Sequence, residues 1–115
     1  MPSRRPERVS SLLLEAVADV LMREVKDPRV RGVTLTGVTI STDLKVAKIF
    51  FTTLRGEDQS AALAGLQSAT AYIKRQIAVH LRLRHTPDLR FLYDTTLERA
   101  SRLEGLLRQA GEKEQ

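Results

Sequence analysis

The sequence predicts an α+β fold, a three-stranded β-sheet with helices packed on one face, because helical and strand patterns follow one another in the order α-β-β-α-β-α. Length and composition agree with this, since 115 residues with 42% hydrophobic content suit one modest core. Aromatic residues make up only 4% of the chain, so the core must be mainly aliphatic. No repeat or long linker divides the chain, and residues 1–115 are expected to form a single domain.

The first half of the chain predicts a helix followed by a β-hairpin. Apolar residues recur every three or four positions from Val9 to Leu21, and Pro6 suits a first helical turn, so we expect a helix ending near Val25. The segment 26–32, K-D-P-R-V-R-G, ends it because the residue before a proline disfavours helical geometry. Alternating strands are expected on either side of a turn at 41–45, and a phase slip predicts a β-bulge at Gly37.

The second half predicts a long helix, a strand and a short helix. Asp58 is a suitable N-cap for a helix that runs to about Leu83, before Thr86–Pro87 stops it. Residues 88–93 read as a third short strand. Thr95 and Glu98 have the spacing of a capping box, which begins a short final helix. Residues of about 1–5 and 109–115 are expected to be flexible.

The charge of the chain indicates an anionic partner. The formal net charge is +5, and residues 71–91 hold five cationic side chains against a single aspartate. There is no cysteine, which excludes disulfides and thiolate metal sites and favours a reducing compartment. No long apolar run indicates a signal peptide or a membrane span, so a cytoplasmic location is expected.

The long helix has two unlike faces. One arc carries the apolar residues Leu63, Leu66, Ile73, Ile77 and Leu81 together with Thr70, and can cover a sheet. Another arc carries small residues among cations, with Lys74 at its border: Ala64, Ser68, Ala71, Arg75, Ala78 and Arg82. Small side chains let a phosphate backbone approach the helix while arginines neutralise it. The alternative is a solvated surface, because alanine is the best helix former.

The residues needed for catalysis or metal binding do not form a recognisable constellation. There are two histidines, no H-x-x-x-H pair, no carboxylate cluster with metal-ligand spacing and no phosphate-binding glycine motif. The sequence therefore predicts a binding protein, with no enzyme activity, no metal and no cofactor.

Several motifs in a fixed order make the chain similar to bacterial ribosome-binding factor A over about residues 4–107. They are K-D-P-R at 26–29, S-x-D-L at 41–44 and L-R-x-R-x-x-P-x-L-x-F at 81–91. The resemblance implies a KH-like fold of type II with a kinked second helix. It also implies a monomeric, non-enzymatic assembly factor, which binds the 30S subunit and its 16S rRNA during late maturation and 5′-end processing. Such factors work beside other small-subunit assembly factors and support growth in the cold.

The resemblance also assigns the candidate residues. The RNA-facing role carries over to Lys74, Arg75, Arg82 and Arg84, and less directly to Arg90 and the N-terminal arm with Arg4, Arg5 and Arg8. Where the family has Ala-x-Gly at its helix kink, this chain has Ala69, Thr70 and Ala71. Alanine favours helix over glycine by about 0.8–1.0 kcal/mol, so we expect a shallower kink, or one held by tertiary packing. The G-x-x-G loop of many KH domains is absent at that place.

Three other functions are compatible with parts of the sequence. A general single-stranded nucleic-acid binder would share the basic face, although few aromatic residues are available for base stacking. A small enzyme of ferredoxin-like shape would share the element order. An adaptor whose basic face meets an acidic protein would share the charge.

Overall fold

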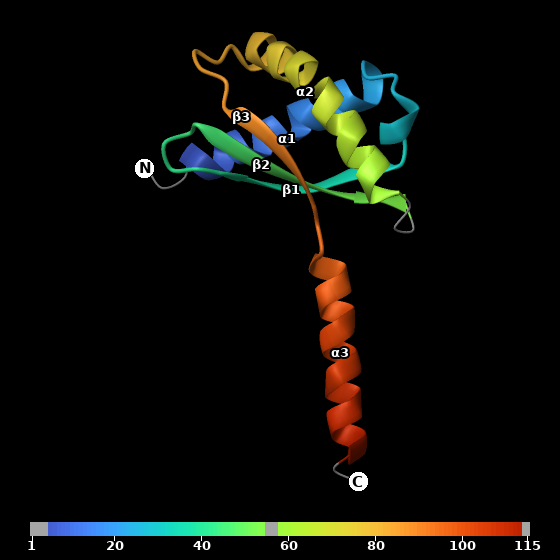
Figure 1. Cartoon of the computed structure of the whole chain (residues 1–115). Coiled ribbons are helices and arrows are strands. Elements are labelled where there is room, and N and C mark those ends of the chain that lie inside the picture. The colour runs from blue at the N-terminus through green and yellow to red at the C-terminus, as the bar shows by residue number, and fades with distance from the viewer. Residues whose placement is uncertain (1–4, 55–57, 114–115) are drawn as a thin grey trace.

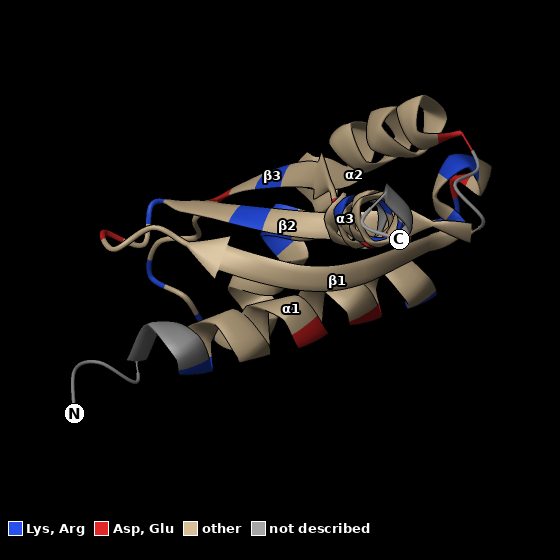
Figure 2. Ribbon diagram, turned by 90° about the horizontal axis from the view of Figure 1, so that it is seen from below, with Lys and Arg blue, Asp and Glu red and all other residues tan. Residues whose placement is uncertain are grey.

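The computed structural model describes residues 5–54 and 58–113, which form one mixed sheet and three helices. The elements are α1 (Arg5–Arg23), the 3-10 turn η2 (Pro28–Val30), β1 (Val33–Ile40), β2 (Val46–Thr53), α2 (Gln59–Leu81), β3 (Asp88–Tyr93) and α3 (Thr96–Lys113). The strand order is β1-β2-β3, with β1 antiparallel and β3 parallel to the central β2. Helices α1 and α2 cover one face of the sheet and leave the other open (Figure 1, Figure 2). This arrangement confirms the predicted α+β class.

The core lies between β2 and the two covering helices. Ala47, Ile49 and Phe51 alternate along β2 and are fully buried. They meet fully or almost fully buried residues of both helices, namely Leu13, Val17 and Val20 of α1 and Leu66, Ile73 and Ile77 of α2. The apolar arcs predicted from the helical periodicity are therefore the ones that cover the sheet.

The predicted β-bulge is present in β1, with Thr36 as its extra residue. The pairing passes from Leu35 opposite Phe51 to Gly37 opposite Phe50, which leaves Thr36 without a partner position on β2. The Thr36 hydroxyl donates a hydrogen bond of 2.6 Å to the Asp94 carboxylate, which also accepts one of 2.9 Å from the Thr96 amide. The bulge thus connects β1 to Asp94, whose carboxylate accepts a bond from the first amide of α3.

Both long helices end two residues before the predicted positions. In α1 the amides of Glu24 and Val25 both bond to the carbonyl of Val20, so helical geometry stops at Arg23. In α2 the predicted N-cap at Asp58 is confirmed, while Arg82 takes a left-handed C-cap conformation with φ 51°. Pro87 is not what stops α2, because the chain has already turned at Arg82.

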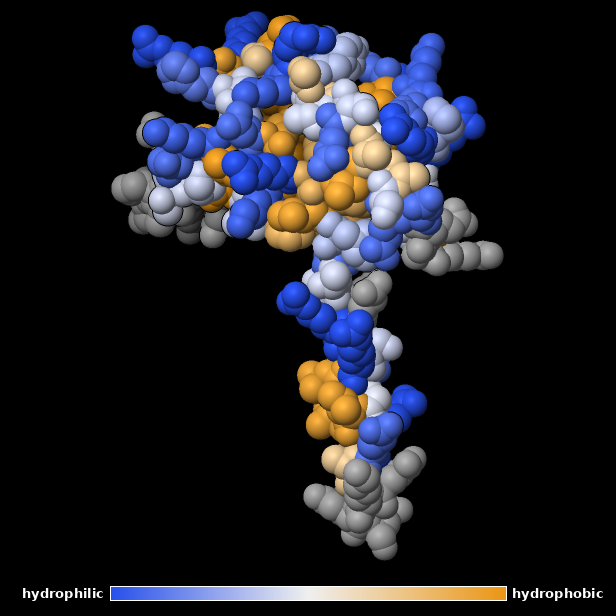
Figure 3. All heavy atoms as spheres, in the orientation of Figure 1, coloured by the Kyte–Doolittle hydropathy of each residue, from blue (hydrophilic) through white to orange (hydrophobic). Residues whose placement is uncertain are grey.

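Helix α3 corrects two expectations. It has 18 residues, and is not short; residues 109–113, expected to be flexible, are part of it. It projects from the body and does not pack on the face that α1 and α2 cover (Figure 1). Leu103, Leu106 and Leu107 are exposed and form a separate apolar patch on its surface (Figure 3). Because α3 starts beyond the end of β3 at the open face, its apolar residues cannot reach the core.

Turn η2 packs closely against α2 at Gly65. A Cβ atom placed on Gly65 would lie 2.8 Å from Cγ1 of Val30 and 3.0 Å from Cβ of Arg29. Val30 is itself buried, so it has little freedom to move away. Only glycine at this position allows η2 and α2 to approach so closely.

Replacing Gly65 by alanine should destabilise the domain. Overpacking typically costs about 1–3 kcal/mol, while alanine regains about 1 kcal/mol of helix propensity, so a net loss of about 1 kcal/mol is expected. The measurement is the free energy of unfolding in urea. Gly105→Ala in α3 is the matched control, because a Cβ there meets nothing within 4 Å, so the variant gains helix propensity without overpacking and should be at least as stable as the original chain. Equal stability of the Gly65→Ala variant and the original chain would contradict the packing role.

Acid should destabilise the fold through carboxylates that are hydrogen-bonded only when the chain is folded. The Ser41 hydroxyl, 2.7 Å away, lowers the pKa of Asp43, and the hydroxyl of Thr36 lowers the pKa of Asp94. With the folded-state pKa below the ordinary 3.8, their stabilisation is complete above that value and is lost as the pH falls through the folded-state pKa. The thermal midpoint should therefore be flat above about pH 5 and fall below about pH 4. Asp94→Asn should reduce this acid dependence, and an unchanged slope would show that Asp94 does not contribute.

Candidate nucleic-acid interface

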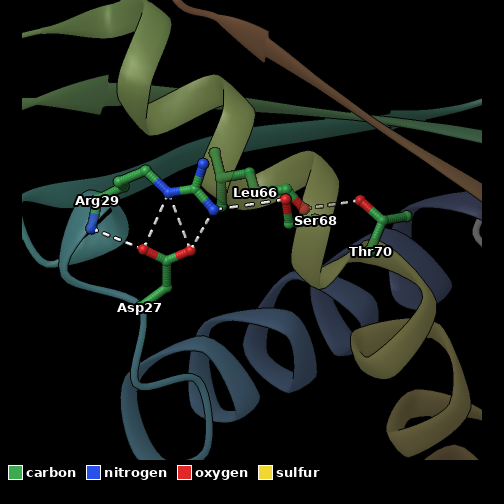
Figure 4. Close-up of polar contacts among 5 residues, drawn as sticks. All are labelled: Asp27, Arg29, Leu66, Ser68 and Thr70. Atoms are coloured by element: carbon green, nitrogen blue, oxygen red, sulfur yellow. Dashed lines mark hydrogen bonds and ion pairs between the residues drawn. The ribbon is translucent and has the colours of Figure 1, made fainter.

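The K-D-P-R segment contains an aspartate–arginine pair, whose arginine also contacts α2. The carboxylate of Asp27 accepts bonds from the Arg29 amide at 2.9 Å and from its guanidinium at 2.6–3.1 Å (Figure 4). Arg29 lowers the pKa of Asp27, whose carboxylate in turn raises the pKa of Arg29. The same guanidinium donates to the Ser68 hydroxyl at 3.4 Å. Part of the small-residue surface of α2, Gly65 and Ser68, therefore serves contacts within the chain.

Most of the small-residue surface, Ser68 included, is still accessible to solvent. We call Ala64, Ser68, Ala71, Arg75, Ala78 and Arg82 the α2 basic face. Ser68, Ala71, Arg75 and Arg82 are exposed, and Ala64 and Ala78 are half-buried. None of the buried core residues belongs to this set. The helix therefore offers a surface of low relief, on which arginines stand beside side chains of one or two heavy atoms.

The cations of this region differ in how far they are already neutralised. Lys74 forms an ion pair of 2.8 Å with Asp88 at the start of β3, and this pairing lowers the pKa of Asp88. Arg75, Arg82 and Arg84 form no ion pair within residues 5–54 and 58–113. The sequence placed all four in one group, but only the three arginines present an uncompensated charge.

The segment predicted to kink is continuous helix. Residues 69–71 lie inside α2, and none of them has a positive φ. The Thr70 hydroxyl donates to the carbonyl of Leu66 at 2.8 Å, a side-chain bond of the kind that often bends helices (Figure 4). In Figure 1 the ribbon of α2 changes direction near its middle. Ala71 thus lies within the helix and does not adopt the left-handed backbone conformation that an abrupt kink at glycine would use.

The remaining candidates lie elsewhere. Arg90 alternates with the buried Leu89 and Phe91 and projects from the open face of the sheet, away from α2. Arg8 is exposed near the start of α1, at the same end of the molecule as the β1–β2 turn (Figure 1, Figure 2). Arg4 lies outside the described residues, and Arg5 is the first residue of α1. The candidates therefore do not form one surface.

Arg29 adjoins the α2 basic face and was not among the candidates. Its contact with Ser68 joins residues that lie 39 positions apart, so no local pattern reveals it. The only signal in the sequence is the D-P-R spacing, since an aspartate two residues before an arginine can accept from its backbone amide.

The structure gives no indication of a metal site or a membrane span in the part of the chain that it describes. No group of three or more histidine and carboxylate side chains is arranged to hold a metal ion there. No helix in the same residues is both long and apolar enough to cross a bilayer.

Comparisons with known proteins agree with the order of motifs. The family model described as ribosome-binding factor A matches residues 5–107. Ribosome-binding factor A of Anaeromyxobacter is 43% identical over 113 residues, which cover 96% of this chain and 92% of that protein. The crystal structure of ribosome-binding factor A from Thermus thermophilus superimposes with a TM-score of 0.70 at 25% identity, covering 76% of this chain and 94% of that one.

A second Thermus thermophilus structure comes from an assembly. It is a homology model of ribosome-binding factor A fitted into a cryo-EM map of a 30S complex, and it matches with a TM-score of 0.64 at 26% identity. It covers 74% of this chain and 90% of that one. With a family model that matches most of its length and a relative 43% identical along nearly all of it, this chain belongs to the ribosome-binding factor A family.

Proposed function

We propose that this protein binds the 30S ribosomal subunit through its 16S rRNA, with the α2 basic face on the phosphate backbone. The observation that carries the proposal is the uncompensated charge of Arg75 and Arg82 among alanines on an exposed helix. Its family membership supports the choice of ligand, because a relative of the same fold has been fitted into a 30S complex. The domain then acts as a KH-like RNA-binding module without the G-x-x-G loop.

Each element of the α2 basic face has a separate part in this binding. Arg75 and Arg82 pair with phosphates and release counterions, which makes the affinity depend on salt. Ala71 and Ala78 keep the helix surface low, so that the backbone can come near the arginines. Arg84 follows in the loop after α2, and Lys74 contributes less because Asp88 already holds it. The N-terminal arm with Arg4, Arg5 and Arg8 is a further contact.

The mechanism is a shift between rRNA conformations and involves no chemical step. A ligand can move such an equilibrium only by its difference in affinity for the two states. The protein, acting as a cytoplasmic monomer without a cofactor, stabilises one arrangement of the rRNA during late maturation and 5′-end processing. Other small-subunit assembly factors act beside it. Growth in the cold is the condition that depends most on this stabilisation of the rRNA.

Charge reversal on α2 should abolish binding to the subunit. Arg75→Glu combined with Arg82→Glu replaces two attractive phosphate contacts by repulsive ones, while both positions are exposed and the fold should persist. The measurement is co-sedimentation with purified 30S and 50S subunits over a salt series. The original chain should bind the 30S subunit and not the 50S subunit, with an affinity that falls as the salt concentration rises.

Arg23→Glu is the matched control for the single variant Arg75→Glu. Arg23 is an exposed arginine on α1, and it forms a surface ion pair with Asp19. The Arg23→Glu variant should keep most of its affinity for the 30S subunit. Equal losses from Arg23→Glu and Arg75→Glu would mean that net charge, and no particular face, determines affinity. An acidic protein competing as well as rRNA would favour the adaptor function.

Enlarging Ala71 should weaken binding without changing the charge. Ala71→Met adds a long apolar side chain at an exposed helical position, where methionine is a good helix former, so stability should hardly change. If phosphates approach α2 at this point, the dissociation constant for 30S should rise by about tenfold, which corresponds to about 1.4 kcal/mol. Ala110→Met on α3 is the control. Unaltered binding by the Ala71 variant would show that the small residues only favour helix.

A further inference from the structure

The open face of the sheet carries a second group of cations, separate from α2. Lys48 of β2 and Arg90 of β3 are directly paired in the parallel register, and both are exposed (Figure 2). Neighbouring strands lie about 4.8 Å apart, so the two side chains stand next to each other. Neither forms an ion pair with any other described residue. Asp88, two residues before Arg90 on the same strand, offsets part of this charge, but it is already paired with Lys74. Two adjacent cations outside any ion pair therefore still attract an anionic ligand.

An apolar row lies beside these cations. Gly37, Phe50 and Leu92 are paired across the three strands, two residues along from Lys48 and Arg90. Leu92 is 40% exposed and Phe50 half-buried. A Cβ atom placed on Gly37 would meet nothing within 4 Å, so neither packing nor a positive φ requires glycine there. The effect of Gly37 is that the residue paired with Phe50 on β1 has no side chain to place over the ring.

A hollow opens over Phe50 at the root of α3. It has a volume of about 370 Å³, and its walls include Gly37, Phe50, Leu92, Thr95 and Arg99. Asp94 also lines it, but its carboxylate already accepts bonds from the Thr36 hydroxyl and the Thr96 amide. The hollow thus combines an aromatic ring, an aliphatic wall, a threonine hydroxyl and a guanidinium.

We infer that the open face of the sheet is a second RNA-contacting surface, which takes one unpaired nucleotide with its base against Phe50. The adjoining phosphates then lie on Lys48 and Arg90, which are about 6.6 Å along the strands, within the span of a nucleotide. Single-stranded RNA is recognised by stacking unpaired bases on aromatic side chains beside cations. An acidic protein segment would use the cations, but its carboxylates would gain nothing from the aromatic ring. This inference rests on the proposed function in one respect, namely that the RNA is ribosomal.

The test uses a short single-stranded RNA that contains one 2-aminopurine, whose fluorescence is quenched when the base stacks. The full chain should quench it, and Phe50→Leu should remove the quenching and weaken binding roughly tenfold or more. Gly37→Thr should also remove the quenching, because its side chain would cover the ring. The fold should be retained, since threonine favours strands and the position has room for a side chain. Lys48→Glu should weaken binding without affecting stability, and Arg102→Glu on α3 is its matched control.

The outcomes separate this surface from α2. Quenching that survives in the Arg75→Glu, Arg82→Glu variant shows that the sheet binds RNA independently. If the original chain fails to sediment with 30S but still quenches the oligonucleotide, the proposed function fails and the inference stands. The inference is overturned if the original chain binds the RNA without quenching, or if Phe50→Leu and Gly37→Thr quench as strongly as it does. Displacement of the RNA by polyglutamate at equal charge concentration would also overturn it.

Discussion

The close approach of η2 to α2 at Gly65 is the constraint that sets how the chain after α1 lies against α2. Together with the core at Leu66 and the pair of Lys74 with Asp88, it brings α2 into contact with its own chain on three sides. Only one side of α2 remains free. Small residues on this helix therefore have two explanations, which depend on position, since Gly65 admits a neighbouring segment and Ala71 faces solvent.

The central strand determines the opposite surface in a comparable way. Because β2 buries Ala47, Ile49 and Phe51, its alternate residues Lys48 and Phe50 must face away from the helices. The bulge at Thr36 restores the alternation in β1, so Val38 returns to the covered face and Gly37 lies opposite Phe50. One extra residue thus keeps the apolar side of β1 on the core, places a glycine opposite the half-buried Phe50 and supplies the hydroxyl that bonds to Asp94.

Periodicity in the sequence was enough to predict the class of fold, the elements in order and the bulge, because those follow from which side chains avoid water. What it could not predict depends on contacts between distant residues. The helix ends at Arg23 and Leu81 follow from backbone bonding, and Lys74 meets Asp88 only once β3 lies beside α2. The leucine spacing of α3 predicted a helix correctly, but a spacing does not say whether anything covers the apolar side.

The two proposed RNA surfaces lie on opposite sides of a thin molecule, and this bears on how binding can select a conformation. Helix α2 and the open face meet near the β3 edge, where Lys74 and Asp88 join the two layers. Contact with both surfaces requires an RNA strand flexible enough to cross this edge, which a rigid duplex resting on α2 is not. An rRNA arrangement that offers a phosphate backbone to α2 and an unpaired nucleotide to the sheet gains the contacts of both surfaces. Any other arrangement gains the contacts of one surface only. That difference in contacts is the free energy available to favour one arrangement over the rest.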